Sequence, residues 1–180
     1  MSEKSLVAGL FGVFLLLAAG CHEVAGEEGG QVSPGAAGDV APLGGSGVSG
    51  RATFYQQGDI LLVTIDLMGL APGPHGVAVD EHGSCGDHGG AAGGYFKPAG
   101  QDDGPGMGKH SPAGDLGNIV ADGNGMAHLQ VEDHGLSLDG PDSVVGLTLV
   151  VYADQDDLKS QGPGASGARI GCGMIYRMEP

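Results

Sequence analysis

Apolar and polar residues alternate along several short stretches of this chain, most clearly over residues 60–68 (ILLVTIDLM). The odd positions of this stretch are all apolar, whereas Thr64 and Asp66 interrupt the even positions. A period of two predicts a β-strand with one buried face. By the same kind of pattern, bounded by turn residues, strands are predicted over 50–55, 60–68, 75–80, 125–132, 144–152 and 169–176.

Glycine and proline separate these stretches. The chain has 38 glycines and ten prolines, a content that would normally suggest low complexity. From Arg51 onward, however, they lie between apolar stretches, as at the turns of short strands. No convincing amphipathic helix lies between the predicted strands. We therefore expect an all-β fold, an antiparallel β-sandwich or flattened barrel, with two long loops over 82–113 and 153–168.

The N-terminus has the pattern of an export signal. Lys4 precedes an apolar stretch over 6–19, which is too short for a membrane span and ends in small residues. The sequence Leu-Ala-Ala-Gly before Cys21 is similar to the bacterial lipobox, in which the cysteine sulfur is acylated. An ordinary signal peptide cleaved nearby is the alternative. We expect a signal peptide over 1–20 and a protein held in a bacterial cell envelope by a lipid on Cys21.

Residues 21–47 are predicted to form a flexible tether. They are mostly glycine, alanine, serine and proline with a few acids, so they offer little apolar surface to bury. The remainder, 48–180, is expected to form one domain, since roughly 130 residues can bury a sizeable core.

The chain is strongly acidic. It has 22 acidic and seven basic residues, a formal net charge of −15. This charge disfavours binding to nucleic acid and to anionic membrane surfaces. We therefore expect no nucleic-acid partner, and contact with the membrane only through the lipid anchor.

Several motifs carry a family resemblance. In chain order they are GLAPGPHG at 69–76, GGYFKP at 93–98, GDLGNIV at 114–120, VVYADQDDL at 150–158 and GARIGCG at 167–173. Together they closely resemble the copper/zinc superoxide dismutase family, from about residue 48 to residue 175. The resemblance implies a Greek-key barrel of about eight strands, in which the two long loops are the metal-site loop and the electrostatic loop.

The same resemblance identifies the metal-ligand positions, and most of them have changed. Where the family has four copper-binding histidines, this chain has Ala78, Asp80, Tyr95 and Tyr152. The family's zinc site shares the position of Tyr95 and adds three more, which here hold Asp103, Pro112 and Asp115. Of all these, only Asp115 keeps the family's residue type. Two supporting residues are retained by resemblance: Asp156, which links the two metal sites in the family, and Arg169, which guides the superoxide anion.

These changes remove the chemistry of dismutation. One metal ion must be reduced and oxidised in turn, and neutral imidazoles suit copper in that role. The methyl group of Ala78 cannot ligate a metal, and a tyrosine, with a reference pKa of about 10, ligates as phenolate only at a cost. We therefore expect no superoxide dismutase activity and no bound cofactor. Side chains alternate between the two faces of a strand, so Ala78 and Asp80 are expected on the face that would have met copper. Val77 and Val79 are expected on the opposite face.

The cysteines fit an exported protein. With Cys21 as the lipid anchor, Cys85 and Cys172 remain as an even pair in an oxidising compartment. Both positions match the family's intrasubunit disulfide, so we expect them to be joined.

Six of the seven histidines lie in the predicted domain, and they have simpler roles than metal binding. By resemblance His75 is a structural residue, and His128 and His134 are expected at the surface. In the first long loop, His82, His88 and His110 lie near acids and Met107, but their spacing matches no metal motif. We therefore interpret them as exposed loop residues, with a weak metal site as the alternative.

Three functions are consistent with this sequence. The favoured one is a pseudoenzyme of the superoxide dismutase type, acting as a binding or structural module. The second is an active dismutase with a rebuilt metal centre of Asp80, Asp115 and loop histidines. The third is a copper- or zinc-binding lipoprotein that uses His82, His88, Met107 and His110. In the pseudoenzyme, a small ligand enters a cleft lined by Ala78, Tyr95 and Tyr152, or the tyrosines fill the site themselves. The ligand and the oligomeric state, monomer or dimer, stay open.

Overall fold

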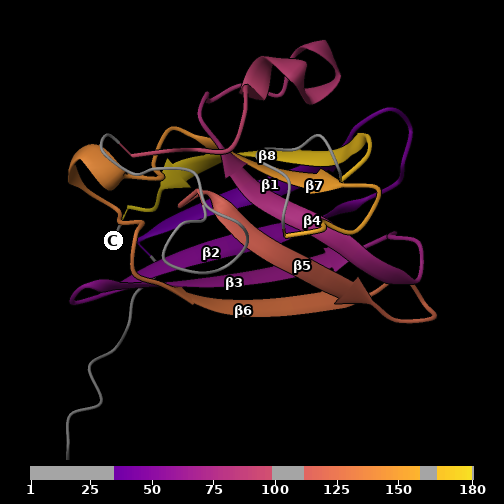
Figure 1. Ribbon diagram of the computed structural model, residues 1–180, viewed down its shortest axis with the longest axis horizontal. Helices are drawn as coiled ribbons and strands as arrows, with labels where there is room; N and C mark the ends of the chain where they lie inside the picture. Colours follow the sequence, from indigo (N-terminus) through magenta and orange to yellow (C-terminus); the bar gives the residue numbers. More distant parts are fainter. Residues whose placement is uncertain (1–34, 99–111, 159–165, 180) are drawn as a thin grey trace, which may run out of the picture. The chain divides into compact units, whose positions relative to one another are not determined.

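Eight antiparallel strands close into a barrel in the computed structural model of the chain, which describes residues 35–98, 112–158 and 166–179 (Figure 1). Around the barrel the order is β1-β2-β3-β6-β5-β4-β7-β8. Because β6 lies beside β3 and β7 beside β4, the chain crosses between non-consecutive strands, as in a Greek key. The strands are β1 (Ala36–Pro42), β2 (Ser49–Gln57), β3 (Ile60–Met68), β4 (Gly73–Asp80), β5 (Asp115–Ala121), β6 (Ala127–Asp133), β7 (Thr148–Tyr152) and β8 (Arg169–Arg177). This architecture confirms the predicted all-β fold.

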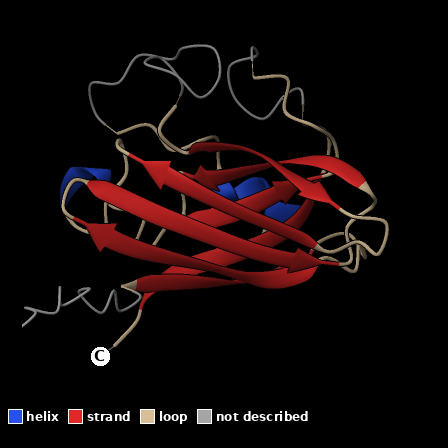
Figure 2. Ribbon diagram, turned by 90° about the horizontal axis from the view of Figure 1, so that it is seen from below, coloured by secondary structure: helices blue, strands red, loops and turns tan. Residues whose placement is uncertain are grey.

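Helical structure is sparse in the described part of the chain. It consists of two short 3-10 segments, η1 (Asp87–Ala92) and η2 (Gly140–Asp142), which Figure 2 shows beside the red strands. Among the described residues we find no helix with the length and apolar character of a membrane span.

Alternation along β3 builds the centre of the barrel. Leu61, Val63, Ile65 and Leu67 are buried with at most 2% of their surface exposed, as predicted, while the residues between them are half-buried or exposed. Each such aliphatic side chain contributes about 1.5–3 kcal/mol when it leaves water. They pack with residues from the other strands, including Phe54, Ile119 and Leu149.

The first strand corrects the predicted domain boundary. β1 pairs with β2 on one side and with β8 on the other, so it closes the barrel. Residues 36–42 therefore belong to the folded domain and not to a tether over 21–47. Sequence pattern misses this strand because the residues it buries are small, chiefly Ala36 and Ala37 with Val40. The predicted signal peptide, Cys21 and the first part of the predicted tether, up to residue 34, lie outside the described residues.

Two further strand boundaries differ from the prediction. β5 was not among the predicted strands, because five of its seven residues are buried and its inner and outer faces do not alternate clearly. The strand predicted over 144–152 begins only at Thr148, since a turn closes before it. In that turn the backbone N–H of Leu147 donates to the carbonyl of Val144, and Gly146 has a φ of 88°.

A disulfide fastens the first long loop to the last strand. Cys85, just after β4, is bonded to Cys172 in β8, which confirms the predicted pairing. The described part of this loop, up to Pro98, also holds η1 and an isolated β-bridge between Asp80 and Tyr95. These contacts position Tyr95 over the outer face of β4.

Candidate functional site

The changed ligand positions come together on the outer face of the barrel. Val77 and Val79 of β4 point into the main core, whereas Ala78 belongs to a separate cluster, so the predicted division of the two faces is confirmed. We call this second group the outer cluster; its buried members are Ala78, Ala92, Tyr95, Val150, Tyr152 and Cys172. β4, β7 and β8 supply most of it, and the disulfide-bonded loop supplies the rest.

An ion pair between Asp80 and Arg169 lies at the edge of the outer cluster. Nη2 of Arg169 lies 3.1 Å from Oδ2 of Asp80, and the same nitrogen donates to the carbonyl of Gly93. The side chain of Asp80 has no exposed surface, and that of Arg169 is 19% exposed. Nε of Arg169 is buried without a hydrogen-bond partner among the described residues. Arg169 is thus directed inward, at a carboxylate of its own chain.

Tyr152 completes this pair. Its hydroxyl lies 3.4 and 3.3 Å from the two carboxylate oxygens of Asp80, to which it donates. The guanidinium carbon of Arg169 lies 5.8 Å from the centre of the Tyr152 ring, within the range of a cation–π interaction. Asp80, Arg169 and Tyr152 therefore form one connected set of contacts.

Burial controls the protonation of these groups. It raises the pKa of Asp80 to about 6, with the charge of Arg169 acting in the opposite direction. Burial and the neighbouring Asp80 carboxylate both raise the pKa of Tyr152 above its ordinary value. At neutral pH Asp80 is therefore mostly ionised and Tyr152 is a neutral phenol.

Asp156 organises a second set of hydrogen bonds. Tyr95 donates from its hydroxyl to Oδ2 of Asp156 at 2.6 Å, and the hydroxyl of Ser166 donates to the same oxygen at 3.2 Å. The other carboxylate oxygen accepts from the backbone N–H of Leu158, and Asn118 bonds the backbone of Asp156 twice. Burial and the bond to Asp156 raise the pKa of Tyr95. Asp156 is thus buried, with both oxygens occupied by protein donors.

The two sets of bonds meet at the tyrosines. The rings of Tyr95 and Tyr152 pack edge to face, with centroids 6.1 Å apart and an interplanar angle of 71°. Such aromatic pairs contribute about 0.5–1.5 kcal/mol beyond the area they bury. Ala78, Tyr95 and Tyr152 are at most 3% exposed, so they do not together line a cleft, and the tyrosines fill the space between them. The alternative of a ligand cleft lined by all three residues is therefore wrong.

A hollow does remain outside the tyrosines. It has a volume of about 340 Å³ and is lined by Asp87 and His88 of η1, by Tyr152 and Arg169, and by Gly90, Gly167 and Ala168. Of the described residues at ligand positions, only Tyr152 reaches it.

The described zinc-ligand positions do not form a metal site either. Pro112 is buried and carries no ligand atom, and Asp103 lies outside the described residues. Asp115, at the start of β5, is buried, which raises its pKa, and its Oδ1 accepts from the backbone N–H of Gly117 at 2.9 Å. Within 35–98, 112–158 and 166–179, no three His, Cys, Asp or Glu side chains lie close enough to hold a metal ion.

These residues do not fit copper or zinc. Ala78 offers no donor atom, and the carboxylate of Asp80 is paired with Arg169. A phenolate ligand at Tyr95 or Tyr152 would require deprotonation against a raised pKa. The donor set that remains is oxygen only, whereas copper prefers imidazole and thiolate.

The histidines that the structure describes are dispersed over the barrel. His75 is 3% exposed, and its Nδ1 and Nε2 lie 3.0 and 2.8 Å from the carbonyl oxygens of Tyr152 and Ala71, in keeping with the structural role expected of it. His82 is exposed with its Nδ1 3.8 Å from Glu81, and His88 lies in η1. His110, together with Met107, lies outside the described residues.

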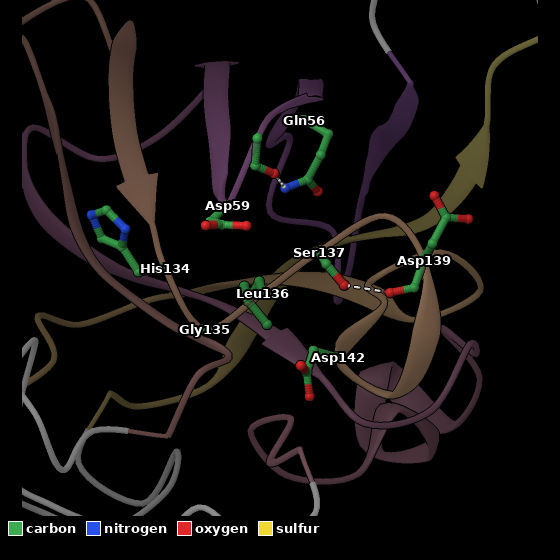
Figure 3. Close-up of a pocket in the computed structure, with 9 residues that line it drawn as sticks. Gln56, Asp59, His134, Gly135, Leu136, Ser137, Asp139 and Asp142 are labelled. Atoms are coloured by element: carbon green, nitrogen blue, oxygen red, sulfur yellow. Dashed lines mark hydrogen bonds between the residues drawn. The ribbon is translucent and has the colours of Figure 1, made fainter.

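His134 lines a different hollow, of about 360 Å³, at the turn between β2 and β3 (Figure 3). Asp59, Asp139 and Asp142 make this hollow acidic, and Asp139 is paired with Arg177 at 2.6 Å. It is lined by none of the residues of the outer cluster.

Sequence reasoning missed three contacts of the site. It did not pair Asp80 with Arg169, it did not include Ser166 beside Asp156, and it did not place the carbonyl of Gly93 on Arg169. The signal for the first lay in the sequence, because a carboxylate on the face that would have met copper, once buried, needs a cation or a donor.

Comparison with known proteins shows which family this chain is similar to. Residues 48–175 match the family model described as copper/zinc superoxide dismutase (SODC). The chain is 36% identical over 147 residues to "Superoxide dismutase [Cu-Zn]" of Onchocerca volvulus, which covers 76% of this chain and 93% of that protein. It is 35% identical over 137 residues to "Extracellular superoxide dismutase [Cu-Zn]" of Brugia pahangi, covering 71% of this chain and 69% of the relative.

Proposed function

The chain belongs to the copper/zinc superoxide dismutase family. We propose that it is a member of this family that does not dismutate superoxide. In this proposal the barrel is a binding or structural module whose metal centre has been replaced by bonds between side chains. The replacement consists of two parts, one around Asp80 and one around Asp156.

The ion pair of Asp80 with Arg169 carries the proposal. Asp80 stands where the family has a copper-binding histidine, and Arg169 matches the arginine that guides the anion. With the two residues 3.1 Å apart, Asp80 ligates no metal and the positive charge of Arg169 is largely neutralised. One substitution thus disables two parts of the family's chemistry.

The contacts of the two tyrosines also support the proposal. Tyr95 and Tyr152 take positions at which the family has metal ligands, and their rings and hydroxyls fill the space with protein contacts. Asp156, which in the family connects the two metal sites, here accepts from Tyr95 and Ser166. The barrel is therefore held together at this place without a metal ion.

We also propose that the protein is exported and anchored in a bacterial envelope by a lipid on Cys21. The apolar stretch before Cys21 supports export. The disulfide between Cys85 and Cys172 supports an oxidising compartment. One relative bears the name of an extracellular superoxide dismutase, which agrees with export.

The proposal is tested with the full chain, loaded with Cu(II) and Zn(II) under oxidising conditions and then freed of loosely bound ions. We expect no superoxide dismutation above that of a barrel variant with Tyr152→Phe. A rebuilt metal centre predicts instead an activity that chelators abolish and that Asp80→Asn and Asp115→Asn both reduce. That outcome would overturn the proposal.

A restored variant serves as the positive control for the assay. It carries histidine at the four copper positions, Ala78→His, Asp80→His, Tyr95→His and Tyr152→His. If this variant gains copper-dependent activity, the frame is shown to be intact and the inactivity of the natural chain is due to its ligand positions.

A further inference from the structure

A group of side chains that can bind a soft metal ion lies on the solvent-facing side of β3 and β6. None of these residues belongs to the site described above. β3 and β6 are paired with Asp66 opposite His128 and Leu67 opposite Ala127. Met68 and Met126 are the next residues beyond this last pair, and both line the same hollow. Leu67 and Ala127 point inward with 2% and 7% exposure, so their neighbours on either side point outward. Asp66, Met68, Met126 and His128 therefore occupy adjacent positions on one solvent-facing patch.

Both methionines are unusually exposed for apolar side chains. Met68 and Met126 each have 50% of their surface exposed. Together with Asp66, Leu67, Ala127 and His128 they line a hollow of about 230 Å³. Directly opposed residues of antiparallel strands have Cβ atoms about 4.5–5.5 Å apart, and diagonal neighbours about 7–8 Å apart. The long thioether chains can therefore converge on one ion beside the imidazole.

Asp66 fixes the imidazole of His128 in the form that a metal requires. Oδ1 of Asp66 lies 2.7 Å from Nδ1 of His128. An ionised carboxylate only accepts hydrogen bonds, so Nδ1 carries the hydrogen, and in the neutral imidazole Nε2 then has the lone pair. No protein partner for Nε2 is found in the described part of the chain. A carboxylate bound to the far nitrogen is the usual arrangement behind a metal-bound histidine.

The ligand types select the metal. Thioether sulfur is a soft donor that favours Cu(I), and imidazole accepts copper as well. We propose that Met68, Met126 and His128 form a surface site for Cu(I), with Asp66 as the positioning residue of the imidazole. This site shares no residue with the replaced centre around Asp80, so it goes beyond the proposed function and does not depend on it.

The surrounding charge is compatible with a cation. Arg51 is opposite Asp66 on β2, but its guanidinium is paired with Asp39 at 2.6 Å. The chain as a whole has a formal net charge of −15. The approach of a monovalent cation is therefore not opposed by the protein's overall field.

The binding is measured on the full chain under reducing conditions. Cu(I) is titrated in competition with a chromophoric Cu(I) chelator, and Ag(I), which does not change oxidation state, is titrated against protein with ¹³C-labelled methionine methyl groups. We expect the methyl signals of Met68 and Met126 to shift together as Ag(I) is added. Each of Met68→Leu, Met126→Leu and His128→Asn should weaken Cu(I) binding at this site tenfold or more. Asp66→Asn should weaken it about tenfold, as substitutions behind a metal ligand do.

Met174 provides a matched control. It is 51% exposed on β8, close to the 50% of the two proposed ligands, but it has no part in the patch. Met174→Leu should therefore leave Cu(I) affinity unchanged, and its methyl signal should not move with the other two. All five substituted residues are exposed, and thermal unfolding of each variant checks that the barrel is intact.

Two results would overturn this inference. One is an Ag(I) titration in which neither Met68 nor Met126 shifts; the other is a Cu(I) affinity that the three ligand variants leave unchanged or that Met174→Leu lowers equally. Failure of the proposed function has a different signature, namely superoxide dismutation that depends on Asp80 and persists in the Met68→Leu and His128→Asn variants. The two proposals can thus fail separately.

Discussion

Asp80 and Arg169 lie 89 residues apart in the sequence and form an ion pair at 3.1 Å in which the carboxylate is fully buried. The pair connects the end of β4 to the start of β8, two strands that are separated in the barrel by β7. Because a buried charge without a partner is costly, each residue requires the other. Arg169 therefore has a structural role here that its position in the family would not suggest.

Replacing Arg169 with methionine should destabilise the barrel strongly. Among the described residues, Arg169→Met leaves the buried Asp80 carboxylate with only the hydroxyl of Tyr152 as a polar side-chain partner. Removing one member of a buried ion pair costs about 3–5 kcal/mol. We expect a loss of this size in the free energy of unfolding at pH 7.5, measured with urea. At pH 5 the loss should be smaller, because Asp80 can then take up a proton.

Arg51 offers the matched control for this experiment. It pairs with Asp39 at 2.6 Å and lies over the ring of Tyr176, as Arg169 does over Tyr152, but both charged side chains are exposed. Exposed ion pairs contribute at most about 1 kcal/mol. Arg51→Met should therefore have a small effect. Equal losses for the two variants would contradict a special role for the buried pair.

The stability of the protein should depend on pH through Asp80. Its pKa is raised from 3.8 to about 6 in the folded state, mainly by burial. The folded protein therefore binds this proton more tightly than the unfolded chain does. The contribution is fully present below about pH 4 and is lost as the pH rises through about 6, amounting to roughly 3 kcal/mol at about 1.4 kcal/mol per unit.

Asp80→Asn isolates this contribution. Asparagine has no carboxyl proton to release, so the free energy of unfolding of the variant should lack the fall that wild type shows between about pH 4 and pH 6. The difference between the two proteins is measured by urea unfolding at intervals from pH 4 to pH 8. A difference that stays constant over this range would show that Asp80 does not titrate as its burial requires.

The parts of the fold that the sequence predicted are those in which a strand buries large side chains on one face. β3 is the best example, since its apolar positions alternate and are buried as expected. β1 was missed because alanine and glycine give little hydrophobic signal, although Ala36 and Ala37 are completely buried. Such a strand is recognised only from its partners, which the sequence does not reveal.

The sequence predicted which metal-ligand residues the site has lost, but not which side-chain contacts replace them. The resemblance to a family identified Ala78 and Asp80 as changed ligand positions, and the structure places them on the expected face. It could not reveal that Asp80 and Arg169 bond to each other, because their contact depends on the fold of two distant strands. Family resemblance assigned Arg169 a role toward an external anion, whereas the structure pairs it with a carboxylate of its own chain.

The hydroxyl of Tyr95 should contribute measurably to stability. It donates to the buried carboxylate of Asp156 at 2.6 Å, and hydrogen bonds to charged groups contribute about 1.5–3 kcal/mol. Tyr95→Phe keeps the ring contact with Tyr152 and removes this bond, together with the longer contact of the hydroxyl with Oγ of Ser166 at 3.4 Å. We expect a loss of that size in the free energy of unfolding. Tyr176→Phe is the control, because its bond to Asp39 at 2.8 Å is exposed and should contribute less than about 1 kcal/mol. If the two variants lose the same amount, burial of Asp156 is not what gives the bond its strength.

The closure of the barrel by β1 can be tested by shortening the chain from its N-terminal side. A chain that starts at residue 48 lacks β1 and leaves β2 and β8 with unpaired edges, although it contains the whole range matched by the family model. Unpaired strand edges favour association with other chains. We expect this shortened chain to aggregate or to lose its cooperative thermal unfolding, while a chain that starts at residue 32 unfolds in a single transition. Cooperative unfolding of the chain that starts at residue 48, with the stability of the longer one, would show that residues 36–42 are not required to close the barrel.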